Sequence, residues 1–257
     1  MRLTGNCLEV KRVSNLLEIN NLCKSFKGLK AVNDVSFTAE EGKITGLIGS
    51  NGAGKTTVFN MISGSFNPTS GRVFYRGKDI TDLKPHQYTY EGIARTFQIM
   101  KPLTNMTVLD NVVSGAFYGR CKCRTLSQAR EEAKEILKFA GLYEKRDWYP
   151  NDMGTPFRKR LELARALVTK PDLLLLDEVM AGLNPTETDE AVALVRKINE
   201  SGVTVLLIEH VMRAVVNLCE KIVVMHHGEK IAEGTPEQVM NDPYVIEIYL
   251  GKEEQDG

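Results

Sequence analysis

The run of residues 49–56 limits what this chain can fold into more than any other feature of its sequence. It reads Gly-Ser-Asn-Gly-Ala-Gly-Lys-Thr and fits the pattern G-x-x-x-x-G-K-[S/T] of a phosphate-binding loop. An apolar run at residues 44–48, bounded by glycines, precedes it, and a helical pattern follows it. A Gly-rich turn that happens to precede a lysine is the alternative, but a buried strand before the loop and a helix after it are the context that the motif requires.

The chemistry of phosphate binding explains the composition of this loop. Glycines let the backbone curl, so that successive N–H groups and the positive end of the following helix face phosphate oxygens. The Lys55 ammonium then neutralises the terminal phosphates, and the Thr56 hydroxyl is placed to bind Mg²⁺. We expect the phosphates to be held by Gly49, Ser50, Asn51, Gly52, Ala53, Gly54, Lys55, Thr56 and Thr57.

A second motif lies at residues 173–178, which read Leu-Leu-Leu-Leu-Asp-Glu. A buried strand that ends in carboxylates presents them at the carboxyl edge of a sheet, where nucleotide-hydrolysing folds hold their acids. We expect Asp177 to hold Mg²⁺ and Glu178 to activate the attacking water as a general base. An acidic pair can also cap the next helix, but its combination with the phosphate loop favours the catalytic interpretation.

The hydrophobic periodicity predicts an α/β fold. Short alternating runs over residues 16–37, and a hairpin that turns at Gly77, indicate antiparallel strands. Residues 106–168 have a helical pattern. Two unbroken apolar strands, separated by a helix, then predict a parallel sheet covered on both faces. The pattern therefore predicts an α/β fold with a parallel-sheet core, an antiparallel front part and an inserted helical layer.

Composition and charge exclude several other classes of protein. The 257 residues are 42% hydrophobic, which is too apolar for a disordered chain. The 33 Lys and Arg residues balance 33 Asp and Glu residues, so we expect no nucleic-acid partner. No apolar run reaches the roughly 18–20 residues of a membrane helix. The five cysteines indicate reduced thiols, and Cys121 and Cys123, with no His nearby, do not favour a metal site.

Taken together, the motifs resemble those of the ATP-binding-cassette (ABC) ATPases, over residues 16–251. In that family's order, the sequence contains the phosphate loop, Gln98, the pair Asp177 and Glu178, the stretch Ala-Gly-Leu-Asn-Pro at 181–185, and His210. The resemblance implies that Gln98 reaches magnesium and the attacking water, and that His210 contacts the γ-phosphate. Each feature alone has another explanation, such as an exposed glutamine, a turn or a helix cap; their order favours the family.

The resemblance also implies cofactors, a dimer interface and a division of the chain. The implied fold class is an α/β P-loop NTPase (RecA-like) with a parallel-sheet core, an antiparallel β-subdomain and an inserted helical subdomain. ATP and Mg²⁺ are the implied cofactors. Phe26 resembles the aromatic residue that stacks on adenine, although a core aromatic at a strand end is the alternative, and Val32 is assigned to the same nucleotide site. Residues 181–185 resemble the loop that crosses the dimer interface. The implied division is a flexible leader at 1–15, a single ATPase domain at 16–251 and a tail at 252–257. Within the domain, residues 16–98 and 169–251 form the α/β core with its β-subdomain, and residues 99–168 form the helical subdomain.

One family motif is altered in this chain. Residues 153–157, Met-Gly-Thr-Pro-Phe, stand where the family usually has its signature Leu-Ser-Gly-Gly-Gln. We expect Thr155 to be the N-cap of a helix with Pro156 at the first helical position, so that the helix end still points at an anion. In this family each ATP lies between one subunit's phosphate loop and the other subunit's signature. The alteration therefore weakens the site that the partner's phosphate loop forms, and we expect a heterodimer with one competent site.

Within the family, four stretches are similar to the first ATPase subunit of the branched-chain amino-acid importers of bacteria and archaea: residues 92–98, 106–112, 181–185 and 249–251. This resemblance implies a peripheral ATPase on the cytoplasmic face of the inner membrane. Its implied partners are a homologous ATPase subunit, integral-membrane permease subunits and, indirectly, a substrate-binding protein. The segment from Gln98 to about Gly119 is expected to receive the permease's cytoplasmic helices.

Three alternatives remain open from the sequence. The lipopolysaccharide-export ATPases are similar over the same stretches, so the ATPase of a lipid exporter is one. A nucleotide-dependent interaction module that hydrolyses little is another, and the intact Glu178 and His210 argue against it. Soluble cassette ATPases that act on DNA or ribosomes usually carry two cassettes or a long coiled-coil insertion, and neither is expected here.

Overall fold

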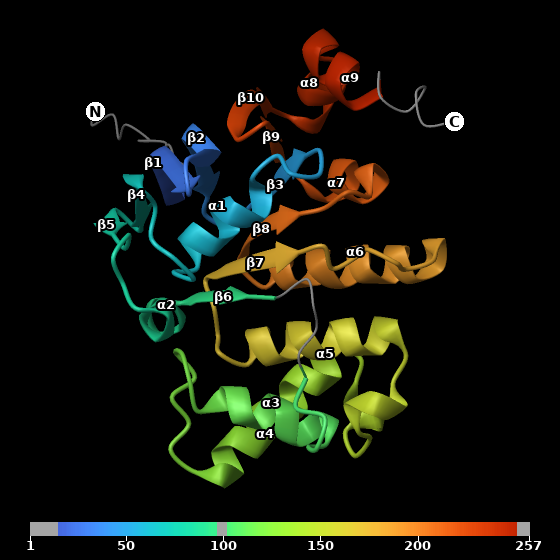
Figure 1. The fold of residues 1–257 in the computed structure, drawn as a ribbon. Coiled ribbons are helices and arrows are strands. Elements are labelled where there is room, and N and C mark those ends of the chain that lie inside the picture. Colours follow the sequence, from blue (N-terminus) through green and yellow to red (C-terminus); the bar gives the residue numbers. More distant parts are fainter. Residues whose placement is uncertain (1–14, 97–101, 251–257) are drawn as a thin grey trace, which may run out of the picture.

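The computed structural model describes residues 15–96 and 102–250, and their strands form two sheets (Figure 1). The first sheet is antiparallel and has the order β2-β1-β4-β5. Its strands are β1 (Asn15–Phe26), β2 (Leu29–Glu40), β4 (Ser70–Tyr75) and β5 (Lys78–Asp79). Arg76 and Gly77 both have positive φ in the turn between β4 and β5, as tight hairpin turns require. The predicted hairpin is therefore confirmed.

The second sheet is the six-stranded core, with the order β10-β9-β3-β8-β7-β6. Its strands are β3 (Ile44–Gly49), β6 (Ile93–Arg95), β7 (Leu173–Asp177), β8 (Thr204–Ile208), β9 (Lys221–His226) and β10 (Glu229–Gly234). All neighbours pair in parallel except β9 and β10, which form an antiparallel hairpin. Because β3, β7 and β8 are neighbours, the phosphate loop after β3 and the carboxylates after β7 lie at the same edge of the sheet.

Alternation along β7 shows that the core sheet is covered on both faces. Leu173 and Leu175 belong to an apolar cluster that fills the space between the two sheets, where Phe59 also packs. Leu174 and Leu176 belong to a second cluster on the opposite face. All four leucines are fully buried, which is why this strand has no polar face in its sequence. The predicted fold class, an α/β fold with a covered parallel sheet, is confirmed.

Helices cover both faces of this sheet, and a further group of helices lies beyond one side of the core (Figure 1). They are α1 (Lys55–Ile62), α2 (Pro85–Glu91), α3 (Val108–Ala116), α4 (Leu126–Phe139), α5 (Thr155–Leu167), α6 (Pro185–Glu200), α7 (Met212–Leu218), α8 (Pro236–Met240) and α9 (Pro243–Leu250). Helix α1 packs between the sheets, and α6 and α7 cover the opposite face. Helices α3, α4 and α5 share an apolar cluster of their own, around Val112, Leu137 and Leu161, which makes them a distinct helical layer.

The start of α5 differs from the prediction by one residue. The N-cap is Gly154, and Thr155 is already helical, whereas the sequence predicted Thr155 as the N-cap. The reason is that the first intrahelical bond, from Arg158 N, is accepted by the Gly154 carbonyl at 3.1 Å. As a result, no side chain caps this helix end, although Pro156 does lie in its first turn as expected.

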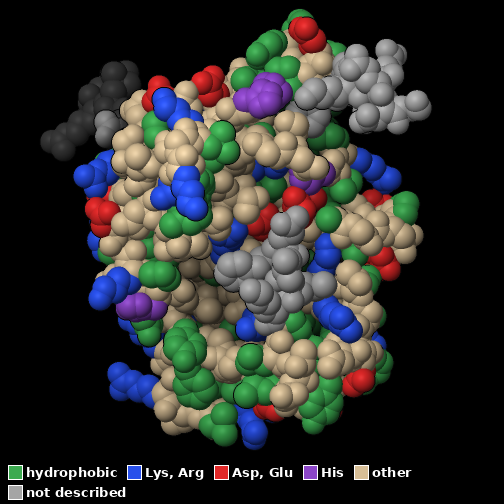
Figure 2. All heavy atoms as spheres, viewed as in Figure 1, with side chains coloured by type: hydrophobic (Ala, Val, Ile, Leu, Met, Phe, Trp, Pro, Cys, Tyr) green, Lys and Arg blue, Asp and Glu red, His purple; other side chains and the backbone are tan. Residues whose placement is uncertain are grey.

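Charges of both signs are interspersed over the face seen in Figure 2, with no large patch of one sign. The predicted leader and tail lie outside the described residues, except that Asn15 is the first residue of β1. Within residues 15–96 and 102–250, no helix is both long and apolar enough to cross a membrane.

Candidate nucleotide-binding site

The phosphate loop lies close to the backbone at Ala31, and this close approach explains why residue 54 is a glycine. Gly54 has φ +97° at the start of α1, and a Cβ there would lie 2.5 Å from the Ala31 carbonyl oxygen. Only glycine combines that conformation with that approach. Residues 51–57, with Ala31 and Glu178, line a pocket of about 270 Å³. The structure therefore brings the two sequence motifs together at one cavity.

Lys55 lies folded back over this loop. Its ammonium Nζ donates to the carbonyl oxygen of Gly49 at 2.6 Å and to that of Ser50 at 3.0 Å. Burial lowers the pKa of Lys55, and the nearby carboxylates of Glu178 and Asp177 oppose that shift. The cation is thus held at the loop by groups that an incoming phosphate can replace.

Asp177 ends β7 with one carboxylate oxygen engaged and one unpaired. Oδ2 accepts a hydrogen bond from Arg95 Nη2 at 2.8 Å. Oδ1 is buried and has no hydrogen-bond partner in the described part of the chain. A buried carboxylate oxygen without a partner is costly, and a hard cation such as Mg²⁺ prefers such oxygen ligands. Thr56 is exposed and lines the pocket of the phosphate loop, and its hydroxyl together with Asp177 Oδ1 is an oxygen donor set that fits Mg²⁺. Gln98, the third expected ligand, lies outside the described residues.

Arg95 is a site residue that the sequence did not identify. From the end of β6 its guanidinium reaches α1 as well as Asp177, donating to Asn60 Oδ1 at 2.7 Å and to Ser63 Oγ at 2.9 Å. The Arg95 and Asp177 side chains are 7% and 1% exposed, so the ion pair is buried. Arg95 therefore connects the strand before Gln98, the helix after the phosphate loop and the acidic strand end. Its signal in the sequence was an arginine directly after two apolar residues.

We expect the Arg95→Met variant to lose about 3–5 kcal/mol of free energy of unfolding, because removing one partner leaves the Asp177 carboxylate buried and unpaired. Denaturation in urea measures this loss. Arg76→Met is the matched control: Arg76 Nη2 pairs with Asp172 at 2.9 Å, but its side chain is 51% exposed, so it should cost about 1 kcal/mol or less. Equal losses in the two variants would contradict the assigned importance of burial.

Glu178 and His210 meet at the end of the sheet, as expected for two groups at one site. Glu178 Oε1 lies 2.8 Å from His210 Nε2. The backbone of Glu178 is left-handed, with φ +52°, and its N–H donates to Ile208 O at 2.9 Å. This turn directs the carboxylate to the pocket of the phosphate loop. Backbone strain of this kind at a non-glycine residue is typical of functional sites.

Two further residues, missed from the sequence, hold the turn after Glu178. Glu209 is 1% exposed, and its Oε1 accepts a hydrogen bond from Met180 N at 2.7 Å. From the other side, Lys159 of α5 donates to Glu178 O at 3.2 Å and to Ala181 O at 2.5 Å. The helix that carries the altered signature is thereby tied to the backbone of Glu178 and of the 181–185 stretch.

Glu209 predicts a specific pH dependence of stability. Burial raises its pKa from 4.5 to about 7, so the folded chain holds this proton more tightly than the unfolded chain. The stabilisation is complete below about pH 4.5 and is lost as the pH rises through 7. The Glu209→Gln variant cannot ionise at this position and so does not lose this stabilisation. As the pH rises from about 4.5 to 7, we therefore expect its free energy of unfolding to increase by about 3 kcal/mol relative to that of the unaltered chain. Urea denaturation across this range measures the difference, with the exposed Glu200→Gln as control; a difference that does not change with pH would contradict it.

The expected adenine-side residues do not line the pocket. Phe26 is 43% exposed and packs edge-on against Phe66, with ring centroids 5.5 Å apart. Val32 is fully buried, and its neighbour Ala31 lines the pocket in its place. The structure thus gathers the phosphate-side residues, and Phe26 remains a predicted stacking residue on the surface.

Two family models match the sequence. The model described as ABC transporter matches residues 32–181, which include the phosphate loop and Asp177. The model described as branched-chain amino acid ATP-binding cassette transporter matches residues 229–255, which begin at β10. The first match therefore covers the phosphate loop and the acidic strand end, and the second covers the end of the chain; Glu209 and His210 lie between them.

Individual relatives match over nearly the whole chain. The high-affinity branched-chain amino acid transport ATP-binding protein LivG of Salmonella typhimurium is 40% identical over 250 residues, covering 92% of this chain and 98% of LivG. The lipopolysaccharide export system ATP-binding protein LptB of Haemophilus influenzae is 36% identical over 239 residues, covering 93% and 98%. The solved ADP conformation of MJ1267, an ATP-binding cassette of an ABC transporter, is 34% identical with a TM-score of 0.85, covering 93% of this chain and 100% of MJ1267.

Proposed function

This chain belongs to the ABC transporter family as one of its ATP-binding cassette ATPases, and from this premise we propose that it hydrolyses ATP to power the import of branched-chain amino acids. The observation that carries the proposal is the 40% identity to LivG over 250 residues. The separate match of residues 229–255 to the branched-chain family model supports it. The geometry supports an ATPase because the phosphate loop and Glu178 line one pocket.

The proposed hydrolysis uses the groups that meet at this pocket. Loop N–H groups and Lys55 bind the β- and γ-phosphates, with the Lys55 ammonium leaving the two carbonyl oxygens that it now contacts. Asp177 Oδ1, Thr56 and Gln98 are the proposed magnesium-holding groups, and the ion when bound neutralises charge on the phosphates. Glu178 accepts the proton of the attacking water, and His210 holds its carboxylate in place at 2.8 Å.

A groove between the core and the helical layer is the proposed permease-docking surface. It has a volume of about 470 Å³, and Arg95, Leu103, Gly115 and Tyr118 are among its lining residues. Tyr118 is 60% exposed and Leu103 is 39% exposed, so apolar surface is available to a partner. Because Arg95 also pairs with Asp177, a helix seated in this groove would lie next to a side chain that contacts the metal-holding carboxylate. With this docking, the proposed location of the chain is peripheral, on the cytoplasmic face of the inner membrane.

The proposed assembly is a heterodimer of two homologous ATPase subunits on the permease. The support is the start of α5, where the usual signature is replaced and where the structure gives no side-chain cap. A partner with an intact signature would complete the site formed by this chain's phosphate loop.

Recovery of this chain from native membranes in mild detergent tests the proposal. We expect a second ATP-binding cassette subunit and two different multi-span permeases to come with it, together supporting uptake of radiolabelled leucine after reconstitution. The LptB relative makes lipid export the second candidate, and its identity of 36% is lower than that of LivG. Recovery of copies of this chain alone with a lipid-export permease would overturn the importer and leave the ATPase in place.

A further inference from the structure

Two thiols face each other in the loop that joins α3 to α4. Cys121 Sγ and Cys123 Sγ are 3.1 Å apart, and both cysteines are unbridged. Each is half-buried, packing against the apolar cluster of the helical layer. A disulfide has sulfurs about 2.05 Å apart, so a movement of about 1 Å would bring these two within bonding distance. Lys122 between them has φ +47°, which turns the chain so that both side chains lie on one side.

We propose that Cys121 and Cys123 form a redox-active dithiol that is oxidised to an intramolecular disulfide by exchange with a low-molecular-weight disulfide of the glutathione class. One thiol loses its proton and attacks the small disulfide, releasing one small thiolate and leaving a mixed disulfide. The second thiol loses its proton and displaces the other small thiolate. Two protein thiols are thus oxidised to one disulfide while one small disulfide is reduced to two thiols, and the protons end on the released thiols.

The surroundings give the two sulfurs an order of reaction. Burial, together with the hydrogen bond and charge of Cys123, raises the pKa of Cys121 to about 11, which keeps Cys121 protonated while Cys123 is reduced. Cys123 is therefore the attacking thiol. Once Cys123 is in a mixed disulfide, its thiol no longer adds to the raised pKa of Cys121; burial and Glu132 still raise that pKa, and the nearby Lys170 ammonium opposes them. Cys121 then resolves the mixed disulfide.

Access and geometry favour a disulfide over a metal site. A surface pocket of about 550 Å³ is lined by both cysteines and by charges of both signs, from Lys122 and Arg124 and from Glu131 and Glu132. Glutathione carries an ammonium group as well as carboxylates, so its charges can be matched at this pocket. Sulfurs that share a tetrahedral zinc ion lie about 3.8 Å apart, farther than the pair here. No group of three or more His, Cys, Asp or Glu residues in the described ranges is arranged to hold a metal ion.

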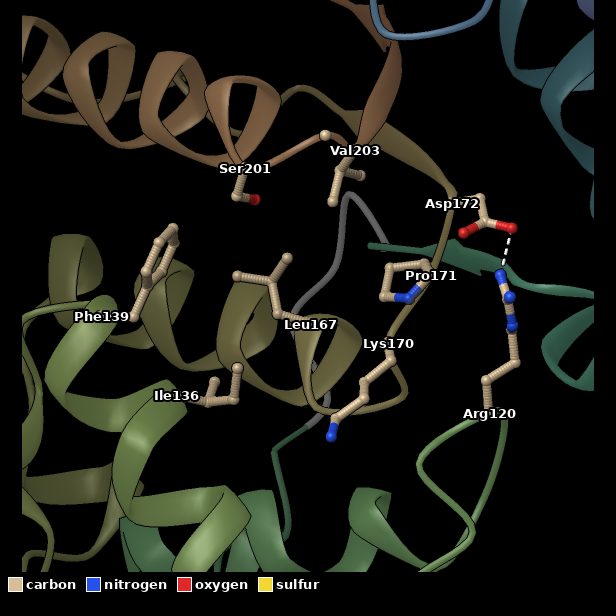
Figure 3. Close-up of a pocket in the computed structure, with 10 residues that line it drawn as sticks. Arg120, Ile136, Phe139, Leu167, Lys170, Pro171, Asp172, Ser201 and Val203 are labelled. Carbon is tan, nitrogen blue, oxygen red and sulfur yellow. Dashed lines mark hydrogen bonds and ion pairs between the residues drawn. The ribbon is translucent and has the colours of Figure 1, made fainter.

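The dithiol is joined to the proposed permease groove by a short and well-anchored segment, so its functional consequence rests on the proposed function. Tyr118 lines that groove, and the next residues are fixed by Arg120, whose N–H donates to Thr169 O at 3.0 Å. Figure 3 shows the Arg120 side chain reaching Asp172, with which it forms an ion pair at the start of β7. On the other side, Cys123 N donates to Ala116 O at 3.3 Å. Drawing the sulfurs together moves a loop that has bonds to both the helical layer and the core.

The test is a redox titration of the assembled transporter in glutathione buffers of increasing oxidised fraction, followed by alkylation and digestion with a glutamate-specific protease. Cleavage after Glu91 and Glu131 leaves both cysteines, and no other, on the peptide of residues 92–131. We expect this peptide to become two hydrogens lighter and to lose both alkylation sites, reversibly with reductant. Cys121→Ser should instead accumulate a glutathione adduct on Cys123. Peptides that stay alkylated at both cysteines, or that bridge only after denaturation, would overturn the dithiol.

A separate measurement tests the link between the dithiol and the proposed permease groove. We expect oxidation to lower permease-stimulated ATP hydrolysis of the complex without changing nucleotide affinity, and a Cys121→Ser, Cys123→Ser double variant to resist that loss. If the disulfide forms while stimulated hydrolysis is unchanged, or if the double variant is equally sensitive, the link is refuted. Because the mass measurement does not depend on what the complex transports, failure of the dithiol and failure of the proposed importer give different results.

Discussion

The Glu178→Gln variant is expected to bind ATP as the unaltered chain does and to lose nearly all steady-state hydrolysis, by about 10²–10⁴-fold. The amide keeps an oxygen at Oε1, 2.8 Å from His210 Nε2, so the shape of the pocket is conserved. It has no basic oxygen to accept the proton of the attacking water. The left-handed backbone at residue 178 and its bond to Ile208 O are unaffected by the change.

Two measurements on the assembled complex separate binding from chemistry. Retention of labelled ATP reports binding, and single-turnover release of phosphate reports chemistry. The control is Glu200→Gln, which removes an exposed carboxylate at the end of α6 and should leave both readouts unchanged. Unchanged turnover in Glu178→Gln would remove Glu178 from the role of general base. Negligible single-turnover hydrolysis by the unaltered complex would favour the nucleotide-dependent interaction module.

The phosphate side of the site could be predicted because it is local in sequence. A strand, a glycine-rich loop and a helix follow each other over residues 44–62, so the pattern itself fixes the arrangement. Asp177 and Glu178 were found for the same reason, since the unbroken leucines before them identify a buried parallel strand and its carboxyl end. The relative order of the strands then brings the two motifs to one pocket.

Arg95, Glu209 and Lys159 could not be predicted because their partners are remote in sequence. Arg95 and Asp177 are 82 positions apart, and Glu209 is 29 positions from Met180. The strand that carries Arg95 is only three residues long, too short to show a period. Packing that only the complete fold determines buries the side chains of Arg95 and Glu209 and half-buries Lys159.

The altered signature leads to the second large prediction, an unequal pair of ATP sites. In the proposed heterodimer, this chain's phosphate loop is served by the partner's signature, whereas the partner's phosphate loop is served by residues 153–157. At that turn the N-cap of α5 is Gly154, which has no side chain to cap the helix, and Pro156 in the first turn has no N–H to donate. Losing one transition-state donor typically costs about 10²–10³-fold in rate. The second site should therefore contribute little to hydrolysis.

Alanine substitutions at the two phosphate-loop lysines distinguish the sites. Lys55→Ala in this chain should abolish hydrolysis by the complex, because it disables the site that has the intact signature. The same substitution at the phosphate-loop lysine of the partner should leave most of the hydrolysis in place. Lys78→Ala, on the exposed hairpin and paired with Glu91, is the control for loss of a lysine. Phosphate release under saturating ATP is the readout.

Restoring the signature tests the same argument in the opposite direction. In the complex whose own Lys55 is replaced by alanine, Pro156→Gly with Phe157→Gln returns a backbone N–H and an amide to the start of α5, and should recover measurable hydrolysis at the partner's site. Equal losses from the two lysine substitutions, or robust cooperative hydrolysis by this chain alone, would show that residues 153–157 function as they stand. In that case the helix end, rather than the missing side chains, would be what the γ-phosphate needs.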